Sequence, residues 1–321
     1  MQKSIRAAVA SDFEAVNAFI VEQLHSNVDL VENIGHYIIN AGGKRMRPVL
    51  VLLAARSCGA TGDAPVKLAA VIEFIHTATL LHDDVVDMSA MRRGRPTANA
   101  QWNNPSSVLV GDFIYSRAFQ VLVSLGHIGI MQVIADTTNV IAEGEVLQLL
   151  NKHRVDITEA EYMRVIGDKT AILFEAAAYC GAMIAGADES IQQALKQVGR
   201  DIGLAFQLVD DALDYDGNVE DLGKNVGDDL AEGKPTLPLI HALKHAEEKD
   251  KELIRQAILN GGTENLQEII RIVQSSGGLE YTRDLAKRHA AAAAEKIMLL
   301  PDSSFRTALL QMSELAVARV S

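Results

Sequence analysis

Two short acidic clusters share one Asp-Asp-x-x-Asp spacing and could bind metal ions. On a helix, the first and last carboxylates of such a cluster lie on one face, one turn apart. Like charges this close repel one another unless a cation lies between them. Oxygen ligands without His or Cys favour Mg²⁺, which water and ligand phosphates complete. The clusters are Asp83, Asp84 and Asp87, and Asp210, Asp211 and Asp214.

A charge run is usually a solvated surface. Here, however, both clusters follow strongly apolar stretches, and the same pattern occurs twice. These two features favour a pair of opposed metal clamps around a diphosphate.

Cationic residues near both clusters could bind that diphosphate. In residues 42–48, three basic side chains lie between a glycine pair and an expected helix start. Glycines let the backbone approach a phosphate, and a helix N-terminus favours anions. Arginine also makes bidentate phosphate contacts. Any one cation alone would be an ordinary surface residue, and only their joint placement favours a site. The candidates are Lys44, Arg47, His76, Arg92, Arg93, Lys169, Lys224 and Lys234.

Helices are the elements expected to position these residues. Between expected helix starts and glycine pairs, the apolar segments run for about 12–28 residues, typical of packed helices. Alternating strands, a hairpin and a βαβ pattern are not expected, so the chain predicts an all-α single domain over residues 1–321. A polar, Gly-rich stretch at 216–238 is interpreted as a functional loop. Helix starts are expected at Ser11 with Glu14, Pro48, Asn104 with Pro105, and Thr158 with Glu161.

Composition restricts the classes of function. The 321 residues carry 30 basic and 42 acidic side chains, a net charge of -12, which argues against a nucleic-acid-binding protein. Apolar residues make up 48% of the chain, enough for a large core. The two cysteines, Cys58 and Cys180, fit a reducing compartment. Residues 49–55 and 176–187 are the best apolar runs and are too short to span a membrane. We therefore expect a cytoplasmic protein.

The combined motifs resemble the trans-prenyltransferases, or polyprenyl diphosphate synthases. The resemblance covers roughly residues 25–320, and stretches 73–82 and 142–148 are most similar to the bacterial octaprenyl-forming members. Short patterns are weak signals alone, but this set is specific. It lies in residues 43–48, 83–87, 92–94, 169–170, 206–214, 223–229 and 233–236.

The resemblance implies a helical bundle of the isoprenoid synthase type around a deep central cavity, a homodimer, and three Mg²⁺ ions. Asp83 and Asp87 would hold two ions and Asp210 would lead the other side, while Asp84, Asp211 and Asp214 would act through water or neighbouring groups. It assigns the allylic diphosphate to Arg92, Lys169, Lys224 and Lys234, and the metal-free isopentenyl diphosphate to Lys44, Arg47, His76 and Arg93. Thr170 and Gln207 would lie near the reacting carbons.

The implied reaction ionises the allylic diphosphate, adds isopentenyl diphosphate to the cation and releases a proton. Repeated cycles from farnesyl diphosphate would give octaprenyl diphosphate for ubiquinone side chains. Ala78 and Thr79 are small where short-chain relatives carry aromatic residues, so a long product is expected, with Phe119 and Leu122 as the tunnel floor. Many relatives end in a basic cluster, whereas residues 318–321 carry a single Arg.

Three alternatives remain. A shorter-chain farnesyl or geranylgeranyl synthase would use the same chemistry. A non-catalytic subunit of a heteromeric synthase would usually have lost an acidic cluster or the arginine pair, and this chain keeps both. A terpene cyclase would normally replace the second cluster and lack the basic segment at 43–48.

Overall fold

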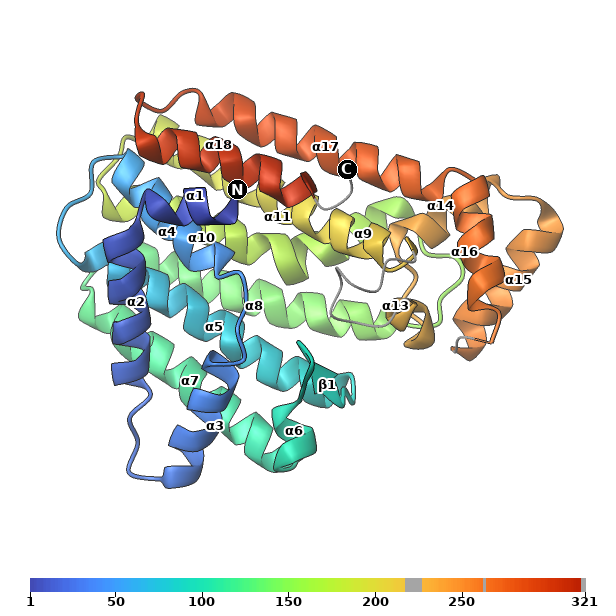
Figure 1. Ribbon diagram of the computed structural model, residues 1–321, viewed down its shortest axis with the longest axis horizontal. Coiled ribbons are helices and arrows are strands. Elements are labelled where there is room, and N and C mark those ends of the chain that lie inside the picture. The colour runs from blue at the N-terminus through green and yellow to red at the C-terminus, as the bar shows by residue number, and fades with distance from the viewer. Residues whose placement is uncertain (217–226, 262–263, 319–321) are drawn as a thin grey trace. The chain divides into compact units, whose positions relative to one another are not determined.

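The computed structural model describes residues 1–216, 227–261 and 264–318, and these residues are mostly helical (Figure 1). The predicted all-α class is therefore confirmed. Contacts divide the chain into two compact units. Unit 1 comprises Met1–Thr138, Leu173–Gly199 and Lys296–Met312. Unit 2 comprises Asn139–Ile172, Arg200–Glu295 and Ser313–Ser321. The single domain over residues 1–321 stays a prediction.

Unit 1 is built around helix α5, which packs against α2, α4 and α7. Both α4 and α5 are apolar on most sides, as expected of helices surrounded by neighbours. The elements of this unit are α1 (Gln2–Ala7), α2 (Ala10–Gln23), α3 (Asp29–Ile39), α4 (Met46–Ser57), α5 (Ala64–Val86), β1 (Met91–Arg92), β2 (Arg95–Pro96), α6 (Ala98–Gln101), α7 (Asn104–Ser124) and nearly all of α10 (Ile172–Ile184).

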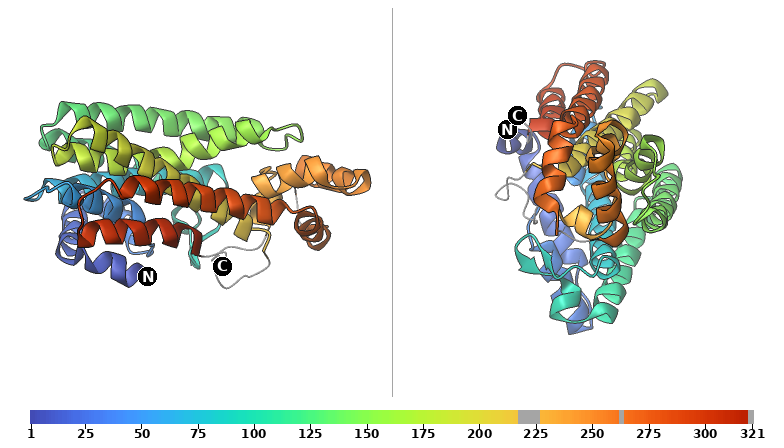
Figure 2. Two further views of the ribbon diagram at one scale, coloured as in Figure 1. Left: turned by 90° about the horizontal axis from the view of Figure 1, so that it is seen from above. Right: turned by 90° about the vertical axis from the view of Figure 1, so that its right-hand side faces the viewer.

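Unit 2 has its own apolar core, in which α14, α15 and α16 pack on one another, as Figures 1 and 2 show from three sides. Its elements are α9 (Glu159–Ile166), the π-helix η1 (Gly167–Ala171), α13 (Asp228–Ala231), α14 (Leu237–His245), α15 (Glu248–Asn260) and α16 (Leu266–Ser275). Four helices begin in one unit and end in the other: α8 (Ile128–Asn151), α11 (Glu189–Leu213), α17 (Gly278–Ile297) and α18 (Ser304–Val317).

Both acidic clusters lie at the C-terminal ends of long helices, α5 and α11, as the apolar stretches before them predicted. Among the described residues, α5 alone has the length and mean hydropathy of a membrane-crossing helix, and 72% of its apolar window is buried inside the structure. Burial to that extent is typical of a core helix. The charged residue Glu73 interrupts the apolar sequence of α5.

The helix starts were predicted with mixed success. Thr158 and Glu161 form the expected capping box of α9. The capping box expected at Ser11 is wrong, because the Val9 carbonyl accepts from the Phe13 N–H at 2.8 Å and α2 already begins at Ala10. Helix α4 begins at Met46, before Pro48. Helix α7 begins one residue earlier than predicted, where the Asn103 side chain caps the Ser106 N–H at 2.8 Å.

One hairpin was not predicted. Strands β1 and β2 are antiparallel, with Arg92 opposite Arg95, and the turn between them is Arg93-Gly94. Both turn residues have positive φ, 53° and 73°, as two-residue hairpin turns of this kind require. Each strand has only two residues, too few for an alternating pattern.

Candidate active site

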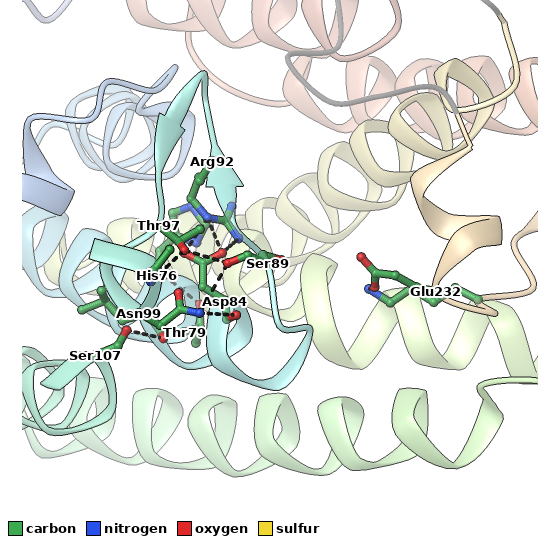
Figure 3. Close-up of polar contacts among 12 residues, drawn as sticks. His76, Thr79, Asp84, Ser89, Arg92, Thr97, Asn99, Ser107 and Glu232 are labelled. Atoms are coloured by element: carbon green, nitrogen blue, oxygen red, sulfur yellow. Dashed lines mark hydrogen bonds and ion pairs between the residues drawn. The ribbon is translucent and has the colours of Figure 1, made fainter. Parts of the chain in front are cut away.

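The first acidic cluster divides into one buried and two partly exposed carboxylates. Asp84 is 1% exposed and accepts two hydrogen bonds from Arg92 Nε, at 2.9 and 3.0 Å. Arg92 Nη2 also lies 2.8 Å from Asp84 Oδ1 (Figure 3). Asp84 therefore orients Arg92. Asp83 and the helix-capping residue Asp87 are the partly exposed carboxylates of the cluster.

The hairpin after this cluster is tied to the end of α5. Thr97 Oγ1 donates to the Ser89 carbonyl at 2.7 Å, and Asn99 Nδ2 lies 3.3 Å from the carbonyls of both Ser89 and Asp84 (Figure 3). These bonds fix the hairpin that carries Arg92 and Arg93. These hydrogen bonds thus fix Arg92 and Arg93 on a hairpin that follows Asp83 and Asp87 closely in the sequence.

A cluster of arginines surrounds His76 on α5. Arg47 Nη1 lies 3.2 Å from His76 Nε2. Because a guanidinium carries only donors, Nε2 accepts this bond and the neutral imidazole has its proton on Nδ1. Burial, and then the charges of Arg47, Arg93 and two further arginines, hold the pKa of His76 well below its usual range. Arg47 also stacks on the Phe174 ring, 4.3 Å from its centroid.

Arg93 lies directly against the glycine pair of the basic segment. Its Nη1 donates to the Gly42 carbonyl, and a Cβ on Gly43 would lie 2.6 Å from that same nitrogen. Gly43 has a φ of 131°, a conformation that favours glycine, and a Cβ there would displace the Arg93 guanidinium. Burial lowers the pKa of Arg93. The Lys44 carbonyl accepts from Arg6 Nη2 at 2.8 Å, which anchors this turn on its other side.

Four arginines and His76 form one cationic cluster in unit 1. Arg47, Arg92, Arg93 and Arg45 are all close enough to His76 to shift its pKa. Positive charge held together in a partly desolvated place is costly unless an anion joins it. The predicted isopentenyl diphosphate residues Arg47, His76 and Arg93 are therefore brought together, with Lys44 in the adjoining turn.

In unit 2, a π-helix presents Lys169 and Thr170. Such one-turn bulges are frequent at functional sites. Lys169 Nζ lies 2.8 Å from Glu145 Oε2 of α8, and Thr170 Oγ1 donates to Gln207 Oε1 of α11 at 3.0 Å. Helix α8 therefore fixes the side chain of Lys169, and helix α11 fixes that of Thr170. A Cβ on Gly144 would lie only 2.8 Å from the Lys169 backbone nitrogen, so α8 and η1 meet at that glycine.

The second acidic cluster has the reverse division, with two buried carboxylates and one partly exposed one. Asp210 is partly exposed, while Asp211 and Asp214 are buried. Asp211 accepts from Gln207 Nε2 at 2.7 Å and from the Tyr162 hydroxyl at 2.6 Å. Burial raises the pKa of Asp211 to about 7, and the charge of Asp229 adds to the shift.

The remaining loop residues lie beside this cluster in unit 2. Asp214 Oδ2 accepts from the Asp229 N–H at 3.2 Å, at the start of α13. The Lys234 N–H donates to the Asp229 carbonyl at 2.8 Å, and its Nζ lies 2.5 Å from Glu232. Lys224 lies outside the described residues, as do residues 217–226 of the predicted loop at 216–238.

The donor set fits Mg²⁺ in an incomplete shell. Within the described ranges, no three His, Cys, Asp or Glu side chains gather closely enough to hold a metal ion by themselves. The buried Asp84 pairs with Arg92 and the buried Asp211 accepts from Tyr162, whereas Asp83, Asp87 and Asp210 are partly exposed and stay the predicted metal ligands. Mg²⁺ typically takes one or two carboxylates and completes its shell with water and phosphate.

The predicted chain-length residues differ in their surroundings. Ala78 and Leu122 are buried, and Thr79 Oγ1 donates to the His76 carbonyl at 2.8 Å. Phe119 packs against Tyr115, with ring centroids 5.2 Å apart, in an open surface hollow of about 460 Å³ on α7. The structure thus places Phe119 at the surface of the chain. The roles of all four residues stay predictions.

Comparison with known proteins decides the family. The family model described as "Polyprenyl synthetase" matches residues 28–275. The chain belongs to this family. The predicted polyprenyl synthase class is thereby confirmed. Unit 1 carries the family's first acidic cluster and basic segment, and unit 2 carries its second cluster.

Individual relatives agree with this assignment. The chain is 52% identical to the octaprenyl diphosphate synthase of Escherichia coli K12, over 99% of this chain and 98% of that one. It is 48% identical to an all-trans-nonaprenyl-diphosphate synthase of Rhodobacter capsulatus, over 99% and 98% of the two chains. The polyprenyl synthase of Caulobacter crescentus, crystallised with calcium and isoprenyl diphosphate, superimposes with a TM-score of 0.96 at 41% identity, covering 100% and 98%.

Several residues that shape the site were not predicted to act there. Arg45 and Glu73 form a buried ion pair beneath the arginine cluster. Phe174 and Tyr162 contact predicted site residues from other helices, and the sequence around them carries no signal of this. Gly144 lies in a segment that resembles the family, but its contact with Lys169 depends on how α8 packs.

Proposed function

We propose that this protein extends farnesyl diphosphate with successive isopentenyl diphosphates to octaprenyl diphosphate, for quinone side chains. The arginine cluster around His76 is the single observation that carries the proposal, since a metal-free diphosphate needs direct cations. The similarity to octaprenyl diphosphate synthases supports the product assignment. A farnesyl or geranylgeranyl synthase is the second candidate, and the buried small residue Ala78 argues for the longer product.

Three Mg²⁺ ions are proposed as the metal cofactor, by analogy with the relative that was crystallised with calcium. Asp83 and Asp87 would hold two ions and Asp210 would lead the third. When bound, Mg²⁺ supplies Lewis-acid stabilisation of the diphosphate as it leaves.

The side chains then have distinct tasks. Arg92, Lys169, Lys224 and Lys234 would bind the allylic diphosphate and stabilise its negative charge as the C–O bond breaks. The isopentenyl double bond attacks the allylic carbon, a C–C bond forms, and one proton is lost. His76 is unsuited to accept that proton because its Nε2 already accepts from Arg47. The released diphosphate is therefore the proposed base, and the apolar side chains of α5 exclude water from the cation.

A cytoplasmic homodimer is the proposed working form. Leu109, Val123 and Ile128 are exposed apolar residues on α7 and at the start of α8, and the hollow around Phe119 lies on the same α7 helix. Exposed apolar surface of this kind typically marks an interface. A second copy of the chain is the proposed occupant.

Purified protein incubated with farnesyl diphosphate, labelled isopentenyl diphosphate and Mg²⁺ tests the proposal. Label should enter a lipid-soluble product only when all three are present, and a chelator should abolish the reaction. A protein inactive alone would instead support the non-catalytic subunit. Lys44→Ala and Arg93→Ala should mainly raise KM for isopentenyl diphosphate. Equal weakening of both substrates would show that the two subsites are misassigned.

A further inference from the structure

Arg45, in the basic segment 42–48, has its guanidinium bonded inside the protein. Its Nη1 donates to Glu73 Oε1 at 2.8 Å and its Nη2 donates to the Ile39 carbonyl at 2.9 Å. The two side chains of the pair are 12% and 10% exposed. The cation of Arg45 is therefore engaged by α3 and α5 rather than offered to a ligand.

The backbone of Arg45 is also unusual. It is the N-cap of α4 and has left-handed dihedral angles, φ 49° and ψ 37°, which non-glycine residues rarely adopt. Such a conformation persists only where surrounding contacts hold it, and it clusters at ligand sites. The bonds to Glu73 and Ile39 supply those contacts. The turn at Arg45 sets the directions in which Lys44 and Arg47 leave the backbone.

Glu73 belongs to the same face of α5 as His76, three residues later. Glu73 holds Arg45, and His76 accepts from Arg47, so two bonds join the start of α4 to one face of α5. If the bond between Arg45 and Glu73 is lost, only the bond between Arg47 and His76 joins the start of α4 to this face of α5. The position of the arginine cluster therefore depends on a pair that lies beneath it.

We propose that Arg45 and Glu73 are positioning residues, which orient Lys44 and Arg47 toward the diphosphate of isopentenyl diphosphate. This inference rests on the proposed function of that surface. A placement error of about 1 Å at such a site costs up to about a hundredfold in rate, and the loss of one charge-assisted contact costs about tenfold in affinity.

A purely electrostatic role for Glu73 predicts the opposite sign. Glu73 is a buried acid whose pKa burial raises, against the opposing charges of Arg45, Arg47 and Arg93. If it only neutralises those arginines, Glu73→Gln makes the surface more positive and lowers KM for isopentenyl diphosphate. If it positions Arg45, the same substitution raises that KM. One variant therefore separates the two roles.

Helix α4 contains a matched control at its other end. Arg56 forms a partly buried bidentate pair with Asp12, at 2.8 and 2.7 Å, with side chains 15% and 20% exposed. Arg56→Met removes an ion pair from the same helix, far along it from segment 42–48. A general loss of α4 stability would affect both ends, whereas lost positioning would not.

The test compares Glu73→Gln, Arg45→Lys and Arg56→Met with the wild type by steady-state kinetics and thermal unfolding. Glu73→Gln and Arg45→Lys should raise KM for isopentenyl diphosphate about tenfold, with KM for farnesyl diphosphate within about twofold, while Arg56→Met lowers Tm alone. Arg45→Lys keeps the charge and shortens the reach, so it remains informative if larger changes prevent folding.

An unchanged or lower KM in Glu73→Gln, or an equal KM change in Arg56→Met, overturns the inference. Calorimetric titration with inorganic diphosphate, without Mg²⁺, measures diphosphate binding directly and so tests the positioning role separately from the proposed reaction. If Glu73→Gln binds inorganic diphosphate more weakly than the wild type, the positioning role is supported. This holds even if the wild type has no synthase activity, and then only the proposed reaction is refuted. Equal binding by both proteins would refute positioning even if the wild type makes octaprenyl diphosphate.

Discussion

Gly144→Ala should impair catalysis without unfolding the protein. A Cβ at this position would lie 2.8 Å from the Lys169 backbone nitrogen, 3.0 Å from the Asp168 carbonyl carbon and 3.1 Å from Asp168 Cβ. Ordinary contacts begin near 3.4 Å. The π-helix must therefore move by about 0.6 Å or more relative to α8, and two of the three contacts are backbone or carbonyl atoms that cannot rotate away.

That displacement falls on Lys169 and Thr170. Catalytic groups need placement within about 0.5 Å, and a 1 Å error costs about a hundredfold. We therefore expect kcat to fall about 10- to 100-fold. Stability should change little, because overpacking costs about 1–3 kcal/mol while alanine favours a helix interior over glycine by about 1 kcal/mol.

Gly129→Ala is the matched control. Gly129 also lies in α8, and its added Cβ would meet Met183 Cε at 3.2 Å, the end of a flexible side chain. Steady-state kinetics with farnesyl and isopentenyl diphosphates, together with thermal unfolding, should show wild-type kcat for Gly129→Ala. A folded Gly144→Ala protein with wild-type kcat would refute the account of how η1 is positioned.

Three further predictions address the metal cluster, the product and pH. Asp83→Ala should lower turnover by at least about 10²–10³ with Tm retained, and near-normal activity would contradict the metal clamp. Ala78→Tyr should stop elongation at short products, as mass spectrometry would show, whereas an active variant with the wild-type product would exclude Ala78 from the tunnel. The pKa of Asp211 is raised from 3.8 to about 7 in the folded protein, so its stabilising contribution is present below pH 3.8 and is lost as pH rises through about 7. Without metal, the Tm of Asp211→Asn should therefore fall less than the Tm of the wild type between about pH 4 and 7. Parallel Tm profiles of the two proteins would refute the raised pKa of Asp211.

The helices and the acidic clusters could be predicted because their signals are local. Apolar periodicity and the repeated Asp spacing are properties of one segment each, so the ends of α5 and α11 were located correctly. The prediction of a capping box at Ser11 failed because a backbone bond from Phe13 to Val9 begins α2 two residues earlier. The hairpin at Arg93-Gly94 was not predicted because two-residue strands carry no periodic pattern.

The supporting contacts of the site could not be predicted, because they depend on packing between segments far apart in the chain. Tyr162 reaches Asp211 across 49 positions of sequence, and Arg45 reaches Glu73 across 28. A tyrosine or glutamate within a helical pattern is compatible with many partners. Only the packing of α9 on α11, and of α4 on α5, selects these partners.

The length of the product is the most direct test of the account. Wild-type protein, farnesyl diphosphate, excess isopentenyl diphosphate and Mg²⁺ should give octaprenyl diphosphate as the main product by mass spectrometry after exhaustive reaction. A main product of geranylgeranyl length, or no elongation of farnesyl diphosphate at all, would contradict the proposed long-chain synthase.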